Sequence, residues 1–230
     1  MKLLFLVALV GVYADMNLYV NYYTDKSVVR QKELDQALAF NVANIQIDRV
    51  YLVVDDGCKY ADKVGGKVVL LPVAKRPTFK DVLELIRVHS KPTDISLTCN
   101  SDIYFDQSLA LVKLFYEQPK NHHTAMALAR YEVNPNGSPR TVVTWADSQD
   151  SWILYGTPKN VVDIDYYYGL LACDPRFAYQ LAAAGYYVIN PSLSIITYHL
   201  HNSGIRYESA KQELTVPGPR YHVYRSRLPL

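Results

Sequence analysis

The sequence predicts an α/β fold in which a mostly parallel central sheet is flanked by helices. Over roughly the first 120 residues, short β-branched apolar runs alternate with segments whose apolar residues recur every three or four positions, as in strands joined by crossover helices. The chain has 230 residues, half of them hydrophobic, and a formal net charge of +2. This composition provides for a large core and excludes a disordered chain.

Four strands and three helices are expected in the first half, in alternation. The expected strands are residues 18–22, 49–54, 67–71 and 95–99. The first helix is expected from Ser27 onward, because Leu34, Ala37, Leu38 and Asn41 have the i, i+3, i+4, i+7 spacing of one helix face. Thr78 begins the second helix, with Asp81 completing a capping box. The third helix is expected over 108–117.

The second half has a different pattern. Residues 124–130 and 140–145 are strand-like, and a helix is expected over 175–184, ended by Gly185. Short strands are expected around Val188 and Ile195, followed by an irregular tail. No composition shift marks a linker, so a single domain with two subregions is expected.

The first 15 residues differ from the rest. Lys2 precedes an apolar run from Leu3 to Val12 and the small residue Ala14, which is the pattern of a secretory signal. The run is too short to span a bilayer, which needs about 20 residues, and no other stretch is suited to cross one. The alternatives are a buried strand or an extension upstream of Met16. The secretory pathway is expected if residues 1–14 are a signal, and the cytoplasm otherwise.

Acidic residues follow two of the predicted strands. Asp55 and Asp56 come after the second strand, and Asp102 comes after the fourth, where ligands bind in open α/β sheets. Asn100-Ser101-Asp102 is a candidate corner for Mg²⁺ or Mn²⁺, which favour carboxylate oxygens. The alternative is a turn in which Asp102 bonds nearby backbone.

Two histidines and one further aspartate are also candidate site residues. His199 and His201 would point to one face of a strand, where they could complete a Mn²⁺ site with Asp102 or form a partly exposed pair at a sheet edge. Asp174 begins a predicted helix, where a carboxylate serves either as a cap or as a general base.

Three further residues are weaker candidates. Asp150 and Trp152 lie in a polar and aromatic stretch that suits sugar hydroxyls and ring faces, or a surface loop. Arg76 follows the third strand, where it would bind phosphate or stay solvated.

Several common motifs are missing. There is no glycine-rich turn after the first strand, no P-loop and no Gly-x-Ser-x-Gly elbow. The near-neutral charge gives no support for a nucleic-acid partner.

The order of the motifs resembles that of glycosyltransferases with the GT-A fold, over about residues 17–205. VVDDG at 53–57 looks like the acidic motif of family-2-type enzymes that contacts the nucleotide base, which implies this role for Asp55 and, less closely, Asp56. Asn100-Ser101-Asp102 is similar to their DxD motif. Asn100 replaces the first acid, so Asp102 is left as the carboxylate for metal and diphosphate.

The later motifs continue the resemblance. The segment YYGLLACDPRFAYQLAAAGYYVINPS is similar to the acceptor side of inverting GT-A enzymes, in which the second acid of a pair is the base. The resemblance assigns this role to Asp174, with Cys173 in place of the first acid. TYHLH resembles the late histidine motif that completes metal binding, which implies His199 or His201. The whole string looks like the small stand-alone transferases of bacteria and large DNA viruses.

The resemblance implies one GT-A domain over 16–230, with a nucleotide-sugar half at about 17–120 and an acceptor half at about 121–216. The implied reaction is metal-dependent, inverting transfer of a hexose or deoxyhexose from a nucleotide-diphosphate sugar, expected to be UDP-linked. The implied ion is Mn²⁺ or Mg²⁺. The acceptor would be a hydroxyl of a glycan, glycoprotein or small molecule.

Two other functions remain open at this point. A nucleotidyltransferase has a similar sheet and a similar metal-binding turn, but it usually has a basic, glycine-rich first loop. This sequence has no such loop. A non-catalytic nucleotide- or sugar-binding module with a decayed site is suggested by Asn100 and Cys173.

Overall fold

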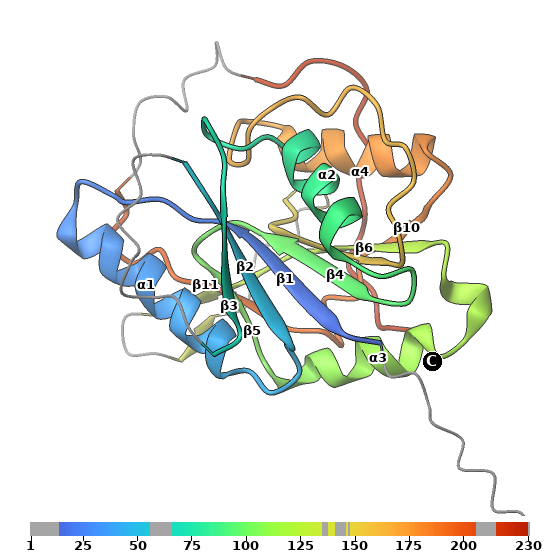
Figure 1. The fold of residues 1–230 in the computed structure, drawn as a ribbon, viewed down its shortest axis with the longest axis horizontal. Helices are drawn as coiled ribbons and strands as arrows, with labels where there is room; N and C mark the ends of the chain where they lie inside the picture. Colours follow the sequence, from blue (N-terminus) through green and yellow to red (C-terminus); the bar gives the residue numbers. More distant parts are fainter. Residues whose placement is uncertain are drawn as a thin grey trace, which may run out of the picture.

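The computed structural model describes residues 14–55, 66–134, 138–140, 146, 148–205 and 215–229. Its centre is a seven-stranded sheet with the order β10-β6-β9-β4-β1-β2-β3 (Figure 1). Its strands are β1 (Met16–Asn21), β2 (Arg49–Val54), β3 (Val68–Pro72), β4 (Ile95–Cys99), β6 (Thr124–Leu128), β9 (Ser151–Tyr155) and β10 (Tyr187–Ile189). Every pairing in this sheet is parallel except those of β9, which is antiparallel to both β4 and β6.

A smaller sheet lies beside the end of β4. Its order is β5-β11-β7-β8, from β5 (Ile103–Phe105), β11 (Thr197–His199), β7 (Tyr131–Val133) and β8 (Pro139–Arg140). β11 pairs antiparallel with β5 and parallel with β7. Only three residues separate β4 from β5, so the small sheet brings segments from three distant parts of the chain to the carboxyl end of β4.

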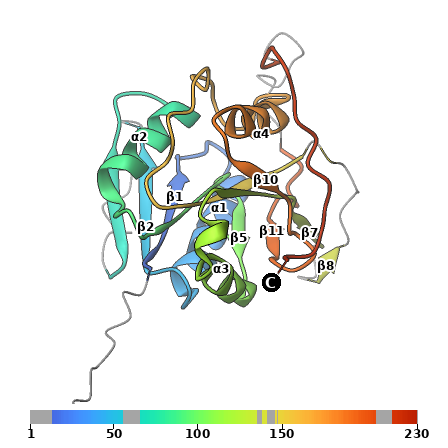
Figure 2. The ribbon, with the colours of Figure 1, turned by 90° about the vertical axis from the view of Figure 1, so that its right-hand side faces the viewer.

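Helices cover both faces of the central sheet (Figures 1 and 2). They are α1 (Val28–Ala43), α2 (Phe79–His89), α3 (Ala110–Tyr116) and α4 (Cys173–Ala183), with 3₁₀ turns at Gln107–Leu109 and Pro119–Asn121. α1 and α3 lie on one face, and α2 and α4 on the other.

Alternation along the strands builds one core on each face. In β1, Leu18 and Val20 pack toward α1 and α3, whereas Tyr19 packs toward α2. In β9, Ile153 belongs to the first core and Trp152 to the second. Strands buried on both faces are the expected consequence of a sheet with helices on each side.

Most of the predicted elements are confirmed, and so is the α/β fold with a mostly parallel sheet. β2 and β4 have the predicted bounds. Thr78 and Asp81 form the capping box at the start of α2. Gly185 follows α4 with a φ of +84°, the left-handed conformation that favours glycine.

The main correction concerns residues 150–155. Ser151–Tyr155 is a central strand rather than a loop, and Trp152 has no exposed surface. Its ring lies edge-on to Phe79 and Phe177, at centroid distances of 5.1 and 5.4 Å. Trp152 is therefore a core residue that offers an acceptor no surface in this structure.

Smaller corrections concern the second sheet. The strand expected around Ile195 lies at Thr197–His199, and β5 and β7 were not predicted. Of the strand-like segment 140–145, only Arg140 is among the described residues, in β8. The expectations for residues 1–13 lie outside the described residues. Where the chain is described, none of its helices is long and apolar enough to cross a bilayer.

Phe79 offers a test of the second core. Its ring stacks on Tyr168 at 3.8 Å and contacts Trp152 and Phe177, so it joins α2, β9 and α4. We expect Phe79→Leu to lower the free energy of unfolding by about 1–2 kcal/mol, because it keeps most of the volume but loses the ring contacts. Urea unfolding measures this. Val88→Ala, at a position that is 76% exposed on the same helix, should stay within about 0.5 kcal/mol of wild type; an equal loss in both variants would contradict the packing role.

Candidate functional site

Asp102 lies in the turn between the two sheets. Ile103 N donates to Asn100 O at 3.1 Å, which closes the turn after β4. Ser101 Oγ donates to the carbonyl of Asn21, the last residue of β1. These bonds place Asp102 beyond the carboxyl ends of β1 and β4, the position predicted for it, where it is 6% exposed.

The two histidines reach Asp102 through strand register. β11 aligns His199 with Ile103 of β5 on one side and with Glu132 of β7 on the other. His199 Nε2 lies 3.0 Å from Asp102 Oδ2, and its Nδ1 lies 2.8 Å from Glu132 Oε2. His201 Nδ1 lies 3.6 Å from the same Asp102 oxygen. Both imidazoles thus face one carboxylate, as their spacing predicted.

These three side chains form a donor set that fits a divalent ion. One ligand atom from each of Asp102, His199 and His201 lies within 4.8 Å of the others. His201 Nε2 is buried and has no hydrogen-bond partner among the described residues. Glu132 contacts the other ring nitrogen of His199, the position that an outer carboxylate takes behind histidines that bind metals. A carboxylate with two imidazoles is a donor set used by divalent transition-metal ions.

An arginine from α1 also reaches this corner. Arg30 is 6% exposed, and its Nη2 donates to Asp102 Oδ2. Its Nη1 donates to Glu33 Oε2 at 2.8 Å and to Leu200 O at 2.9 Å. Glu33 in turn accepts from the backbone and hydroxyl of Ser203, at 2.6 and 2.8 Å. The guanidinium therefore ties α1 to Asp102 and to the chain on either side of His201.

A second arginine extends the network on the opposite side. Arg130 Nε donates to Glu132 Oε1 at 2.8 Å, and its Nη1 donates to Asp150 Oδ2. Asp150 Oδ1 accepts from Asn100 Nδ2 at 2.8 Å. The structure thus brings the predicted residues Asn100 and Asp150 into direct contact. Asp150 is 4% exposed, so in this structure it supports the turn before Asp102.

Alternating charges set the protonation of the cluster. Burial would raise the pKa of Asp102, but the charge and hydrogen bonds of His199, with His201 and Arg30, hold it well below its usual range. Burial would lower the pKa of His199, but Asp102 and Glu132 raise it to about 9. Glu132 is also subject to burial, yet His199 and Arg130 lower its pKa to about 2. Without a metal, His199 is therefore an imidazolium between two carboxylates.

Asp174 lies in the first turn of α4. The residue before the helix, Ala172, has a left-handed φ of 64° and caps the helix with no side-chain hydrogen bond. Cys173 Sγ donates to Asp174 Oδ1 at 3.2 Å. Burial, followed by the charge of Asp174, raises the pKa of the Cys173 thiol, and Asp150 adds to the effect. Cys173 therefore stays a neutral thiol that bonds Asp174.

Arg76 and Asp55 lie outside the Asp102 cluster. Arg76 Nη2 donates to Tyr168 O at 2.6 Å, and its guanidinium lies 5.0 Å from the centroid of the Tyr167 ring, so its described contacts are with the loop before α4. Asp55 is half-buried directly after β2, at the predicted strand end. Asp56 lies outside the described residues.

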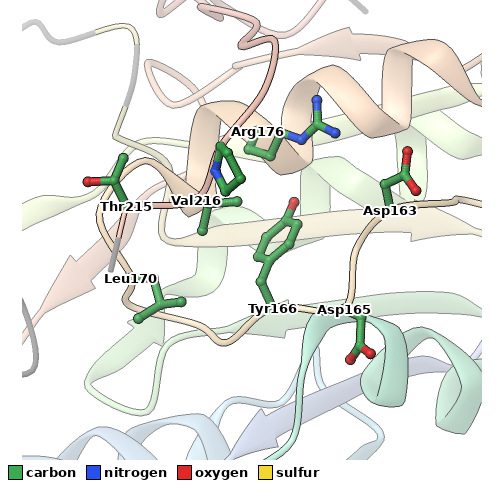
Figure 3. A pocket seen from close by; sticks show the side chains of 8 residues that line it. Asp163, Asp165, Tyr166, Leu170, Arg176, Thr215 and Val216 are labelled. Atoms are coloured by element: carbon green, nitrogen blue, oxygen red, sulfur yellow. The ribbon is translucent and has the colours of Figure 1, made fainter. Parts of the chain in front are cut away.

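A pocket of about 450 Å³ opens beside α4 (Figure 3). Its lining residues are Asp163, Asp165, Tyr166, Leu170, Arg176, Thr215, Val216 and Pro217. The Tyr166 hydroxyl is buried without a hydrogen-bond partner among the described residues. Burial raises the pKa of Tyr166, and Cys173, Arg176 and Asp174 also act on it. The charge of Asp174 therefore acts on Tyr166, a residue that lines the pocket.

The segment after residue 214 forms one wall of this pocket. Val216 N donates to Leu171 O at 2.9 Å, and Arg176 Nη1 donates to Pro219 O at 3.2 Å. A Cβ on Gly218, whose φ is +104°, would lie 2.8 Å from the Arg176 guanidinium. Glycine is needed here because the chain passes directly over Arg176.

Sequence reasoning missed Arg30, Glu132 and Arg130. A local signal existed for two pairs. Arg30 and Glu33 are three apart on a helix, and residues 130 and 132 alternate onto one face of an extended segment. Nothing local, however, indicated that Arg30 reaches Asp102 or that Glu132 reaches His199.

No protein-family model matches this sequence, and comparison with curated proteins finds no match. Solved structures do match its fold. S. aureus TarS 1-349 in complex with UDP-GlcNAc has a TM-score of 0.54 and 16% identity over 86% of this chain and 61% of the other. GalNAc-T7 with UDP, GalNAc and Mn²⁺ has a TM-score of 0.55 and 8% identity, over 83% and 44%.

A third similar structure is the mannosyltransferase PcManGT from Pyrobaculum calidifontis in complex with GDP-Man and Mn²⁺. Its TM-score is 0.51, with 12% identity over 82% of this chain and 58% of the other. The three are GT-A-type glycosyltransferases. The fold of this chain is of the GT-A type, as the motif order implied. The chain covers less than two thirds of the length of each.

The raised pKa of His199 has a measurable consequence. In protein kept metal-free with EDTA, we expect its imidazole to titrate near pH 9 in an NMR titration rather than near 6.5. The folded-state pKa is above the unfolded value, so the stability it contributes, of order 3 kcal/mol, is fully present below about pH 6.5 and is lost as the pH rises through 9.

His199→Gln serves as the control because its amide does not titrate. The difference in the free energy of unfolding between wild type and this variant should shrink between pH 6.5 and 9. A difference that stays constant over this range, or an imidazole that titrates at its ordinary value, would contradict the network.

Proposed function

We propose that this chain transfers a sugar from a nucleotide-diphosphate donor, UDP-linked, to an acceptor hydroxyl. The observation that carries the proposal is the cluster of Asp102, His199 and His201 beyond the carboxyl ends of β1 and β4 in a GT-A fold. Ligands of open α/β sheets bind at this edge. Two of the similar structures hold UDP or UDP-GlcNAc, which supports the donor class.

Asp102, His199 and His201 would hold Mn²⁺, or Mg²⁺, through one carboxylate and two imidazoles. GalNAc-T7 and PcManGT are both complexes with Mn²⁺, in support of such an ion. When bound, the ion would stabilise negative charge on the leaving diphosphate. Asn100 holds the turn in place through its hydrogen bond to Asp150. Asp55 would contact the nucleotide base, and Arg76 would contact a phosphate.

Asp174 would act as the general base of an inverting transfer. Cys173 Sγ donates to one of its oxygens, and the carboxylate would take the proton of the acceptor hydroxyl. It lies in the first turn of α4, near the positive end of the helix dipole. A carboxylate at such a position is suited to deprotonating a hydroxyl during attack.

The pocket beside α4 is the proposed acceptor site. Leu170, Val216 and Pro217 give it apolar walls for ring faces, and the buried Tyr166 hydroxyl and the Arg176 guanidinium give it hydrogen-bond donors. Its volume of about 450 Å³ falls within the roughly 300–1,000 Å³ of small-molecule sites. A saccharide with several hydroxyls fits this lining.

The donor site is tested by melting the protein with UDP, GDP, CDP and dTDP, each with and without Mn²⁺. We expect UDP with Mn²⁺ to stabilise the protein, because a ligand at about 100 times its Kd adds about 2.7 kcal/mol. For a chain of this size, the melting temperature should rise by roughly 5–11 °C. If none of the four nucleotides gives a metal-dependent rise in melting temperature, the donor site is excluded.

The base is tested by Asp174→Asn. We expect transfer to fall by roughly 10²–10⁴-fold, since the amide cannot take a proton, while the UDP and Mn²⁺ melting shift stays at the wild-type value. Loss of the shift as well would make Asp174 structural. Retention of configuration in the product would remove its role as the base of an inverting reaction.

Tyr166→Phe is the matched variant on the acceptor side. With a saccharide acceptor that the wild type glycosylates, it should raise the acceptor KM with little change in kcat, because only a binding hydroxyl is removed.

Nucleotide binding without transfer by the wild type, across a broad panel of acceptors, would favour the non-catalytic binding module.

A further inference from the structure

Three cationic or donor groups of this protein converge on a single carboxylate oxygen. Asp102 Oδ2 accepts from Arg30 Nη2 and from His199 Nε2 at 3.0 Å, and His201 Nδ1 lies 3.6 Å away. A carboxylate oxygen has two lone-pair directions, so these groups already use it fully. His199 and His201 both face this oxygen, so a divalent ion held by all three side chains and bound through Oδ2 would compete with Arg30 for it.

A bound metal would have to displace the Arg30 guanidinium from Asp102, but it could not drive the side chain out of the site. Its Nη1 is held by Glu33 Oε2 at 2.8 Å and by Leu200 O at 2.9 Å, and the side chain is 6% exposed. Neither anchor involves Asp102. If Nη2 were released from Asp102, the guanidinium would still be fixed beside the metal site.

We propose that Arg30 competes with a divalent ion for Asp102: together with His199, its guanidinium neutralises Asp102 when no ion is bound, and the ion must displace Nη2 from Oδ2 in order to bind. This inference rests on the proposed donor site. It adds a residue of α1 that controls how tightly Asp102, His199 and His201 hold a metal.

Displacement also links the ion to the nucleotide. The released Nη2–H needs a new acceptor, because a buried guanidinium without full pairing is costly. A diphosphate brought next to the ion supplies anionic oxygens that match an arginine fork. Arg30 therefore makes binding of Mn²⁺ alone weak and couples it to binding of a nucleoside diphosphate, each strengthening the other by the same factor.

The test is Mn²⁺ binding by the full chain, measured from the EPR signal of free Mn²⁺, with and without UDP. We expect Arg30→Gln to bind Mn²⁺ alone roughly tenfold more tightly or better, because a positive charge a few ångströms from the ion is removed. The factor by which UDP strengthens Mn²⁺ binding should shrink. In the absence of metal, this variant should melt lower than wild type, and Mn²⁺ should raise its melting temperature by more.

Two variants control for charge and for fold. Arg87→Gln removes the same charge at a position where the guanidinium bonds Pro158 O and Lys159 O, and it should bind Mn²⁺ like wild type. Arg30→Lys keeps the charge at the site, and it should bind Mn²⁺ alone within a few-fold of wild type. If Arg30→Gln does not fold, Arg30→Lys still tests the inference. Tight binding of Mn²⁺ alone by Arg30→Lys would overturn it.

The remaining outcomes separate this inference from the proposed function. If wild type and Arg30→Gln bind Mn²⁺ equally, or the variant binds it more weakly, the site is a metal site and Arg30 does not compete for it. If neither protein binds Mn²⁺ with or without UDP, the metal part of the proposed function fails and the inference fails with it.

Discussion

The structure of the site depends on burying the carboxylate of Asp102 between two sheets. A buried carboxylate is costly unless it is paired and hydrogen-bonded, and Asp102 is 6% exposed. Arg30 and His199 provide the pairing, and each of them is itself held by a further acid, Glu33 or Glu132. Because every member neutralises its neighbour, the whole charged group is tolerated where none of its members would be alone.

This requirement explains the small sheet. β5 follows directly from the Asp102 turn, and β11 lies between β5 and β7. That register sets His199 against Asp102 on one side and against Glu132 on the other. The large sheet supplies the edge at which ligands bind in open α/β sheets, and the small sheet supplies charges that stabilise a carboxylate at that edge. Neither sheet alone would form the site.

Local chemistry made much of the fold predictable. The apolar runs of β2 and β4, the capping box at Thr78 and Asp81 and the glycine after α4 each act within a few residues. β9 was missed because its start is polar and its aromatic side chain suggested a binding loop, whereas Trp152 fills the core between α2 and α4. The acids at the strand ends were visible in the same local way. Arg30 and Glu132 were not, since only the tertiary fold brings Arg30 to Asp102 and Glu132 to His199.

The two departures from the GT-A motif pattern have a shared physical explanation. Asn100 and Cys173 each stand where the resemblance expects an acid, and each donates a hydrogen bond to a neighbouring acid, Asp150 or Asp174. An acid at either position would set two carboxylates against each other, which raises the pKa of one of them. A neutral donor instead gives its neighbour a hydrogen bond. Both replacements therefore avoid a pair of like charges, and on this geometry neither is by itself a sign of a decayed site.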